Sequence, residues 1–310
     1  MSKKVIKSYK AFDKNMQCRG FQYEVGKEYE MDGEIKCCDR GFHACKSPME
    51  VWDHYDMLNS RFAEVEQSGK IEEEKNSTKV CSSRIKIKAE LKLADIINIG
   101  VEWLKDITSP SKVKTDVAKN DNGGDSAQIG SSGYSAKIGS SGDSAQIGSS
   151  GYSAKIGSSG DSAQIGSSGY YAKIGSSGYY AKIGSSGYYA KIGSSGDYAK
   201  IGSSGDSAKI GSSGDYAQIG SSGGYAQIGS SGDYAQINST GEDSVIMCAG
   251  NNSMAKAKVG SWITLAEWEW NDEKNRCVPL CVKTEYVDGN NIKADTWYQL
   301  KNGEFVEVTK

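Results

Sequence analysis

The residues with the clearest capacity for metal chemistry lie near the start of the chain. Thiolates and imidazoles can form a closed tetrahedral zinc site. Five such side chains occur there: Cys18, Cys37, Cys38, His43 and Cys45. Their spacing is irregular and includes no Cys-x-x-Cys pair, while Gly41-Phe-His-Ala-Cys45 alternates as a strand does. We therefore favour buried structural cysteines, with a structural zinc ion as the alternative and no other cofactor expected.

A second set of side chains, suited to binding, recurs in the middle of the chain. Lysines that follow a phosphate backbone and aromatic rings that stack under bases are the combination that binds single-stranded nucleic acid. The alternative is a solvated β face on which tyrosines stabilise their own cross-strand stack. The residues expected on this face are Tyr134, Lys137, Tyr152, Lys155, Tyr170, Lys173, Tyr188, Lys191 and Lys209.

Aspartates recur in the same region, and we expect them on an opposite, acidic face. They are Asp125, Asp143, Asp161, Asp197, Asp215 and Asp233. Calcium-binding β-rolls also use nonapeptides with glycines at matching places. Their consensus needs a second Gly, where this chain has Ser, and a displaced Asp that is Tyr or Gly in several units. We therefore predict no calcium site, and expect solvent or a basic partner to offset the like-charge repulsion.

Catalytic chemistry has little support in this sequence. The two histidines are His43 and His54, and neither has a nucleophile or a base at a useful spacing. We therefore predict a protein that is not an enzyme.

The lysines, tyrosines and aspartates belong to a nonapeptide, [D/Y]-[S/Y]-A-[Q/K]-I-G-S-S-G, that repeats from Asp125 to Ile237. A disordered linker has no reason to keep Ala and Ile at fixed positions, so the repeat predicts a β-solenoid. Alternation in Tyr171-Ala172-Lys173-Ile174 predicts a strand with Ala and Ile inward. Gly-Ser-Ser-Gly predicts a tight corner with glycines at positive φ.

The first five units alternate between an Asp…Gln type and a Tyr…Lys type, so the true period is eighteen residues. Eighteen residues form a coil with two nine-residue sides, and like units then stack on one face. About six and a half such coils are expected. One face would carry five lysines against Asp206, and the other six aspartates against Lys182 and Lys200. Both ends need caps, because a bare strand edge invites aggregation.

The flanking segments provide these caps. The helix signal Ser47-Pro48-Met49-Glu50 between alternating runs, followed by a second helix over 93–104, predicts an α+β domain at residues 1–115. Residues 116–124 are a polar linker, 125–250 the solenoid and 251–310 a small β cap with hairpin turns at Asp288-Gly289 and Asn302-Gly303. The fold class is thus mainly β, a two-sided solenoid of 18-residue coils between an α+β domain and a β cap.

Charge and hydropathy exclude several classes. With 37 Lys and Arg against 39 Asp and Glu, the net charge of -2 gives no global attraction to nucleic acid or to a membrane. No apolar window spans a bilayer, and Met1-Ser-Lys-Lys lacks the apolar region of a signal peptide. We expect a cytoplasmic protein that does not bind membranes, in which the 8 cysteines are thiols or metal ligands rather than disulfides.

The chain resembles a family of phage and prophage proteins through Cys18-Arg-Gly-Phe-Gln-Tyr, Gly41-Phe-His-Ala-Cys45, the nonapeptides and Ala294-Asp-Thr-Trp-Tyr-Gln-Leu-Lys-Asn-Gly-Glu-Phe-Val-Glu-Val308. Relatives usually carry repeats richer in Ala, Thr and Gly. The resemblance implies a viral accessory protein in a bacterial host, which binds or sequesters a host component, for example in counter-defence. Two alternatives stay open: single-stranded nucleic acid on the Lys/Tyr face, and self-assembly of unlike faces into a ring or fibre.

Overall fold

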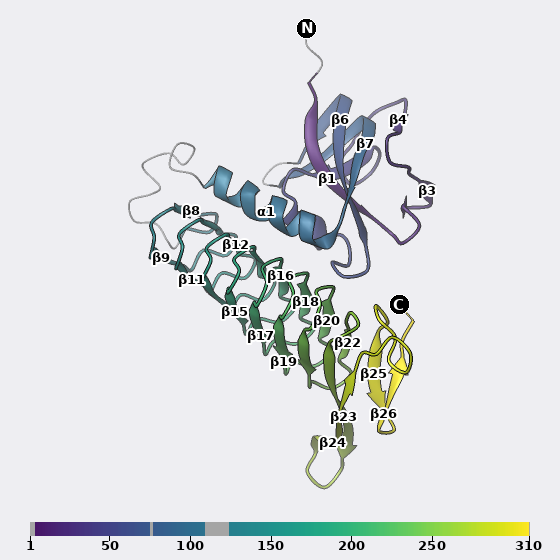
Figure 1. Ribbon diagram of the computed structural model, residues 1–310. Coiled ribbons are helices and arrows are strands. Elements are labelled where there is room, and N and C mark those ends of the chain that lie inside the picture. Colours follow the sequence, from purple (N-terminus) through teal and green to yellow (C-terminus); the bar gives the residue numbers. More distant parts are fainter. Residues whose placement is uncertain (1–3, 75–76, 109–123, 310) are drawn as a thin grey trace. The chain divides into compact units, whose positions relative to one another are not determined.

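The computed structural model describes residues 4–74, 77–108 and 124–309 (Figure 1). The chain divides into two compact units, Met1–Trp103 and Leu104–Lys310, and each is described by itself. The linker predicted at 116–124 lies outside the described residues except for residue 124. Among the described residues, no helix has the length and apolar character needed to cross a membrane.

The first unit is a small antiparallel barrel. Its sheet has the order β4-β7-β5-β1-β6, and a further pairing of β6 with β7 closes the sheet on itself. Phe12, Phe42, Val65, Ile85 and Ile87 alternate along the strands and fill the interior. The strands are β1 (Ile6–Phe12), β2 (Gln17–Cys18), β3 (Phe21–Gln22), β4 (Glu28–Glu30), β5 (Phe42–Cys45), β6 (Arg61–Glu73) and β7 (Lys79–Leu91).

The helical part of this unit is smaller than the α+β prediction. The predicted first helix is a short 3-10 helix, η1 (Met49–Asp53), which begins after Pro48 without a side-chain cap. Pro48, and not the predicted Ser47, stands at the N-cap position. The backbone N–H of Ser47 donates to Thr78 Oγ1 at 3.1 Å. The second predicted helix is confirmed as α1 (Leu93–Ile107). With only one short 3-10 helix besides, the N-terminal unit is a β domain with little helix.

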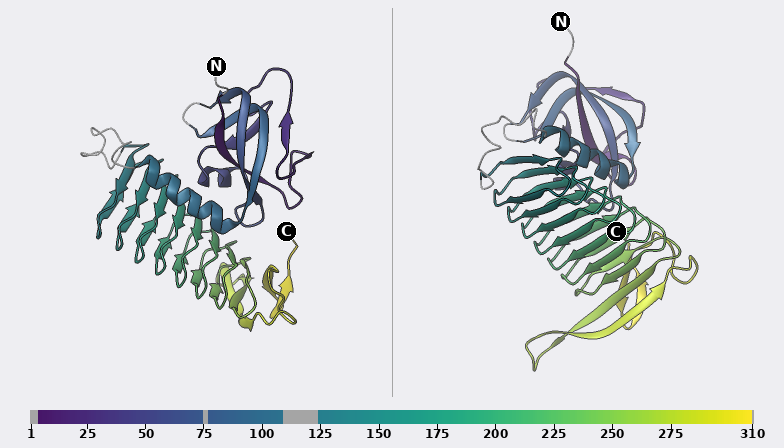
Figure 2. Two further views of the ribbon diagram at one scale, coloured as in Figure 1. Left: turned by 45° about the horizontal axis from the view of Figure 1, so that its top comes forward. Right: turned by 60° about the vertical axis from the view of Figure 1, so that its left-hand side comes forward.

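The second unit is a two-sided β-solenoid with coils of roughly 18 residues, as the alternation of unit types predicts. It has about 8 coils rather than the expected six and a half. Figure 2 shows its coils stacked along one axis. The even sheet contains β8 (Gln128–Ser131), β10 (Gln146–Ser149), β12 (Gln164–Ser167), β14 (Lys182–Ser185), β16 (Lys200–Ser203), β18 (Gln218–Ser221), β20 (Gln236–Ser239) and β22 (Met254–Lys256). The odd sheet contains β9 (Lys137–Ser140), β11 (Lys155–Ser158), β13 (Lys173–Ser176), β15 (Lys191–Ser194), β17 (Lys209–Ser212), β19 (Gln227–Ser230), β21 (Val245–Cys248) and β23 (Trp262–Asn271).

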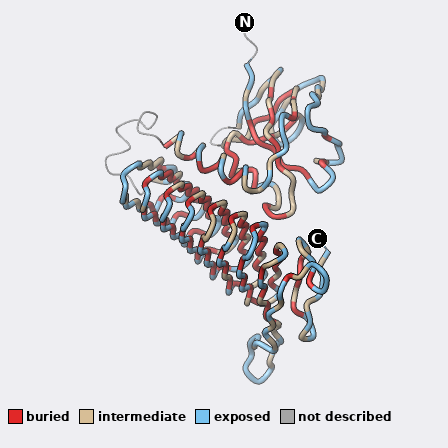
Figure 3. The backbone as a smooth tube through the Cα atoms, viewed as in Figure 1, coloured by how far each residue is buried: buried red, intermediate tan, exposed pale blue. Residues whose placement is uncertain are grey.

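Each strand comprises the residues Lys/Gln-Ile-Gly-Ser, and not Tyr-Ala-Lys-Ile as predicted. Strands pair in parallel with their equivalents one coil away, for example Ile156 with Ile174. The isoleucines and alanines point inward and form one continuous core, and buried residues recur along every coil (Figure 3). Buried and exposed residues alternate in the odd strands, such as β11 and β13, whereas even strands such as β12 and β14 are buried throughout. The strand starts later than predicted because the exposed Tyr171 belongs to the preceding corner.

The corners depend on close packing rather than on positive φ at glycine. A Cβ atom on Gly178 would lie 1.9 Å from the carbonyl oxygen of Gly160, the equivalent residue one coil earlier. None of the glycines of the repeat has positive φ, whereas Tyr198, Tyr216 and Tyr234 do. The second glycine of each unit therefore lets successive corners stack, and the prediction of left-handed glycines was wrong.

The C-terminal cap is built from two hairpins. In the odd sheet, β24 (Arg276–Tyr286) pairs antiparallel with β23. In the even sheet, β25 (Tyr298–Lys301) pairs with β22 and then with β26 (Glu304–Glu307). The turn at Asn302-Gly303 is confirmed, whereas Asp288-Gly289 lies in the connection between β24 and β25. The coils continue past residue 250, because β22 and the start of β23 still pair in parallel.

Candidate binding face

The outer face of the odd sheet carries a row of lysines that the repeat puts in register. In each Lys-Ile-Gly-Ser strand the Ile and Ser point inward, so the Lys and Gly point outward. Lys155 pairs with Lys173, and Lys173 with Lys191. The row contains five exposed lysines, Lys137, Lys155, Lys173, Lys191 and Lys209. All five were predicted from the sequence to share a face.

A shallow groove of about 840 Å³ runs beside this lysine row. It is lined by the Lys, Ile and Gly residues of β9 to β17 together with Gln227. The floor consists of glycine: an added Cβ on Gly157, Gly175 or Gly193 would meet nothing within 4 Å. The same outward position further along the sheet is occupied by Met247, which pairs with Gly229. A side chain is thus compatible with this sheet position, and the groove exists because glycine stands there.

The groove ends at a patch of exposed apolar side chains on the same sheet. Val245 and Met247 on β21 are each 54% exposed, and Trp262 on β23 is 47% exposed. Trp262 pairs with Tyr286 of β24, and their ring centroids are 5.1 Å apart. Exposed apolar groups gathered at one site are typical of a surface that another molecule covers.

Within the described part of the chain, the lysine row has no acidic side chain paired with it. None of the ion pairs formed among the described residues involves any of its five members. The outward positions of β9 to β21 contain no Asp or Glu. Neighbouring like charges at the strand spacing of about 4.8 Å repel by about 0.9 kcal/mol even in water. A partner with carboxylates in a row would relieve this repulsion.

The tyrosines predicted to share this face lie instead at the corner that precedes it. Tyr134, Tyr152, Tyr170 and Tyr188 form one stack with centroids 5.1 to 5.5 Å apart and interplanar angles of 2° to 16°. Each inner ring therefore has a tyrosine on both of its faces. This arrangement matches the alternative of a self-stabilising ladder and leaves the inner rings no open face on which a base could stack.

The aspartates likewise lie at a corner and do not form an acidic face. Asp197 Oδ1 accepts a hydrogen bond from the backbone N–H of Asp215 one coil later, at 2.8 Å. Asp215 does the same for Asp233, and Asp233 for Asn251, at 2.8 and 2.7 Å. These backbone donors offset the repulsion among Asp197, Asp215 and Asp233. On the even sheet, moreover, Lys182 is only 4% exposed.

The five candidate zinc ligands do not converge. Cys18 Sγ lies 2.8 Å from Tyr55 Oη and 3.4 Å from Lys10 Nζ. Cys45 is buried, and desolvation raises the pKa of its thiol to about 12, which favours an inert thiol. Within the described part of the chain, no three Cys, His, Asp or Glu side chains are grouped so that they could hold a metal ion.

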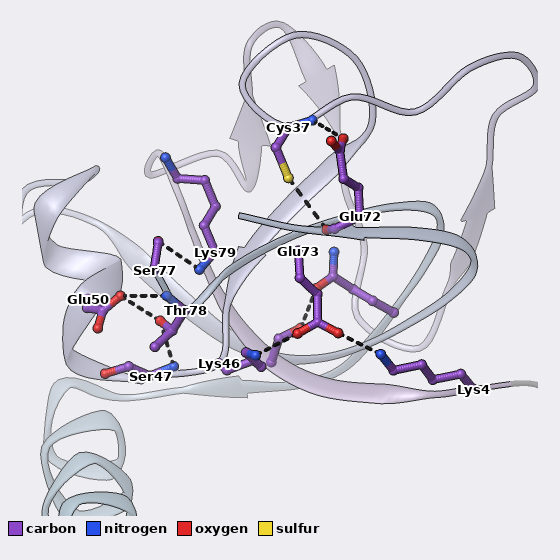
Figure 4. Close-up of polar contacts among 12 residues, drawn as sticks. Lys4, Cys37, Lys46, Ser47, Glu50, Glu72, Glu73, Ser77, Thr78 and Lys79 are labelled. Carbon is purple, nitrogen blue, oxygen red and sulfur yellow. Dashed lines mark hydrogen bonds and ion pairs between the residues drawn. The ribbon is translucent and has the colours of Figure 1, made fainter. Parts of the chain in front are cut away.

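The other three candidates have protein partners of their own. The backbone N–H of Cys37 donates to Glu72 Oε2 at 2.6 Å (Figure 4). The backbone N–H of Cys38 donates to His43 Nε2 at 2.9 Å, and burial lowers the pKa of His43. In the same region Glu73 bridges Lys4 and Lys46, and hydrogen bonds from these two lysines lower its pKa to about 2 (Figure 4). These contacts tie β6 to neighbouring segments.

The sequence did not predict that the Lys10 side chain is buried. It is only 4% exposed in the barrel. Its Nζ donates to the carbonyl oxygen of His43 at 2.9 Å and lies 5.5 Å from the ring centroid of Tyr23. Desolvation lowers the pKa of Lys10, although the neighbouring Cys18 opposes the shift. The only available signal is the alternation in β1, which directs Lys10 to the same side as Phe12.

We expect the free energy of unfolding of the first unit to rise from about pH 7 to about pH 9 relative to that of the variant Lys10→Met, because this range lies below the ordinary pKa of lysine. The unfolded state keeps Lys10 protonated and the folded state disfavours its charge, so the unfolded state binds more protons and stability rises with pH. The raised pKa values of the Cys37, Cys45 and Cys81 thiols lower stability as the pH passes about 8.5, but both chains carry these thiols, so the comparison isolates Lys10. Urea denaturation at both pH values tests this, and an equal gain in the variant would contradict it.

Comparison with known proteins concerns the barrel alone. Residues 6–99 match the family model of a domain of unknown function (DUF7666). This segment covers β1 to β7 and the first half of α1, and it includes none of the solenoid. No curated protein and no solved structure matches the chain.

Proposed function

We propose that the chain is a protein-binding module whose docking surface is the outer face of the odd sheet. The observation that carries the proposal is the row of five exposed lysines on odd strands whose outward positions contain no Asp or Glu. The row ends at the apolar patch of Val245, Met247 and Trp262. A rigid basic row continuous with apolar side chains suits an elongated acidic partner, because charge guides the encounter and apolar burial supplies affinity.

The proposed setting is a phage-infected bacterium, in which the module binds or sequesters a host protein. The motifs at both ends of the chain and their resemblance to phage and prophage proteins support this setting. Nucleic-acid binding is less well supported, because the tyrosines stack on one another instead of standing beside the lysines. Self-assembly of unlike faces is also less well supported, because the aspartates lie at a corner and Asp197 and Asp215 are bonded to its backbone.

The test is affinity capture from a bacterial lysate with the full chain and with the variant Lys155→Glu, Lys173→Glu, Lys191→Glu. We expect the wild type to capture a protein after nuclease treatment, and the variant to bind it at least about tenfold more weakly. High salt should weaken the wild-type complex, because exposed charges are screened.

The matched control is Lys14→Glu, Lys274→Glu, Lys301→Glu, which changes the net charge equally at exposed lysines outside the lysine row. This control should bind as the wild type does. Equal capture by the odd-sheet variant and the wild type would refute the proposal. Nuclease-sensitive capture would favour nucleic acid, and recovery of the chain alone would favour self-assembly.

A further inference from the structure

The glycine floor of the groove has no structural cause within the odd sheet. Glycine in a strand lowers stability because it costs backbone entropy and packs no side chain. Gly157, Gly175 and Gly193 are not at positive φ, and an added Cβ would touch nothing within 4 Å. The corner glycines differ, since a Cβ on Gly178 would strike the backbone. The floor glycines are therefore open to contact from outside the sheet.

The even sheet shows what a glycine floor of this repeat accepts. A Cβ on Gly130 would lie 1.8 Å from the carbonyl oxygen of Thr108. A Cβ on Gly148, one coil later, would lie 2.4 Å from Thr108 Oγ1 and 3.0 Å from the carbonyl oxygen of Leu104. Thr108 continues the helical pattern, because its backbone N–H is bonded to Leu104 at 3.0 Å. The end of α1 thus lies directly on these glycines, with about one helical turn per coil.

The spacing of the lysine row fits a helix better than an extended chain. Coils repeat at about 4.8 Å, and a helix running along the solenoid axis repeats at about 5.4 Å per turn. An extended strand presents side chains to one side only at about every 6.6 Å. Five coils span about 24 Å, which corresponds to a helix of about 16 residues. Acidic residues at i, i+3 or i+4 intervals would therefore meet successive lysines.

We propose that the odd-sheet groove receives an acidic amphipathic α-helix of the partner protein, lying along the solenoid axis. Its carboxylates face the lysine row, its small residues lie on the glycine floor, and its apolar end contacts Met247 and Trp262. This inference rests on the proposed function and adds the form of the partner segment. The glycine floor brings the helix backbone close to the sheet, as the even sheet does for Leu104 and Thr108.

Two synthetic peptides serve as probes, each about 16 residues long and identical in composition. One is stapled as a helix with glutamates at i, i+3 and i+4 intervals, and the other carries D-residues that prevent a helix. Binding to the full chain is followed by fluorescence anisotropy. We expect the helical peptide to bind at least about tenfold more tightly than the non-helical one, with affinity falling as salt rises.

The decisive variant is Gly157→Thr, Gly175→Thr, Gly193→Thr, which fills the floor and leaves all five lysines in place. We expect it to lose at least about tenfold in affinity for the helical peptide while its unfolding midpoint stays equal or rises. The control is Gly224→Thr, a corner glycine at which an added Cβ would meet only ordinary contacts, at 3.7 Å or more. This control should bind as the wild type does.

The outcomes separate this inference from the proposed function. Equal affinity for both peptides would overturn the inference that the partner segment is a helix, and so would unchanged binding of the helical peptide by the floor variant. If binding in these cases still depends on the lysines, the proposal of an acidic partner stands. Peptide binding that persists after Lys155→Glu, Lys173→Glu and Lys191→Glu overturns the proposed function as well. Absence of binding by either peptide, or preference for an oligothymidylate or for a second copy of the chain, also overturns the inference.

Discussion

Gly178→Ala will unfold the central coils of the solenoid, whereas Gly175→Ala, three residues earlier, will leave them intact. The Cβ atom at position 178 would lie 1.9 Å from a backbone oxygen of the neighbouring coil, so it is accommodated only if the coils separate. Separation breaks ladder hydrogen bonds on both sides of the corner, such as that from Lys182 N to Ala163 O. We expect a loss of more than about 4 kcal/mol, because backbone cannot yield as a side chain does.

Whereas Gly178→Ala lowers the free energy of unfolding, the matched variant Gly175→Ala is expected to raise it. Its added methyl group would meet nothing within 4 Å, and φ is not positive there, so alanine should stabilise by about 0.5–1 kcal/mol. Urea denaturation followed by circular dichroism compares the two variants directly. Similar urea midpoints for the two variants would contradict the close packing of corner glycines in successive coils.

A chain that ends at Leu265 will aggregate in a concentration-dependent manner that the full-length chain does not show. The truncation removes β24 to β26 and the part of β23 after Leu265, and it leaves β22 and the start of β23 as bare strand edges. In the intact chain the final strands carry charged residues, such as Lys283 on β24 and Glu304 on β26, which are paired at 2.7 Å. Charged edge strands oppose further pairing, whereas an uncovered solenoid coil is a template for it.

The control for truncation is an internal deletion of one whole coil, residues 173–190, which keeps both caps and the order of the two sheets. We expect this shorter chain to keep the association state of the full-length protein. Size-exclusion chromatography with light scattering over a concentration series compares the three chains. Equal behaviour of the truncated and coil-deleted chains would contradict the capping role of β24 to β26.

The architecture of the solenoid could be predicted because it depends on local repetition. Isoleucine at every ninth position and the alternation of Asp and Tyr units determine both the inward residues and the 18-residue coil. The last coils were not predicted, because the repeat sequence decays after residue 241. There Val245-Ile-Met-Cys248 still places Ile246 and Cys248 inward, although the outward residues have changed.

The tyrosines and aspartates were assigned to the wrong place because the strand begins at the lysine. Alternation cannot distinguish a strand from the corner that leads into it, since Ala172 is buried in either case. The exposed lysines were predicted correctly, because they lie within the strand. Alternation in β1 gave only the side of Lys10, and its partner, the carbonyl oxygen of His43, could not be predicted because it lies 33 residues away along the chain.

The most direct test of the binding face is carbodiimide coupling of the full chain to its captured partner, with the joined residues mapped by mass spectrometry. Carbodiimide links only lysines and carboxylates that are already in contact. The proposed function predicts coupling at Lys137, Lys155, Lys173, Lys191 and Lys209, and little at Lys14, Lys274 or Lys301, although these three are also exposed. Coupling spread evenly over all eight lysines would contradict the claim that the odd sheet is the docking surface.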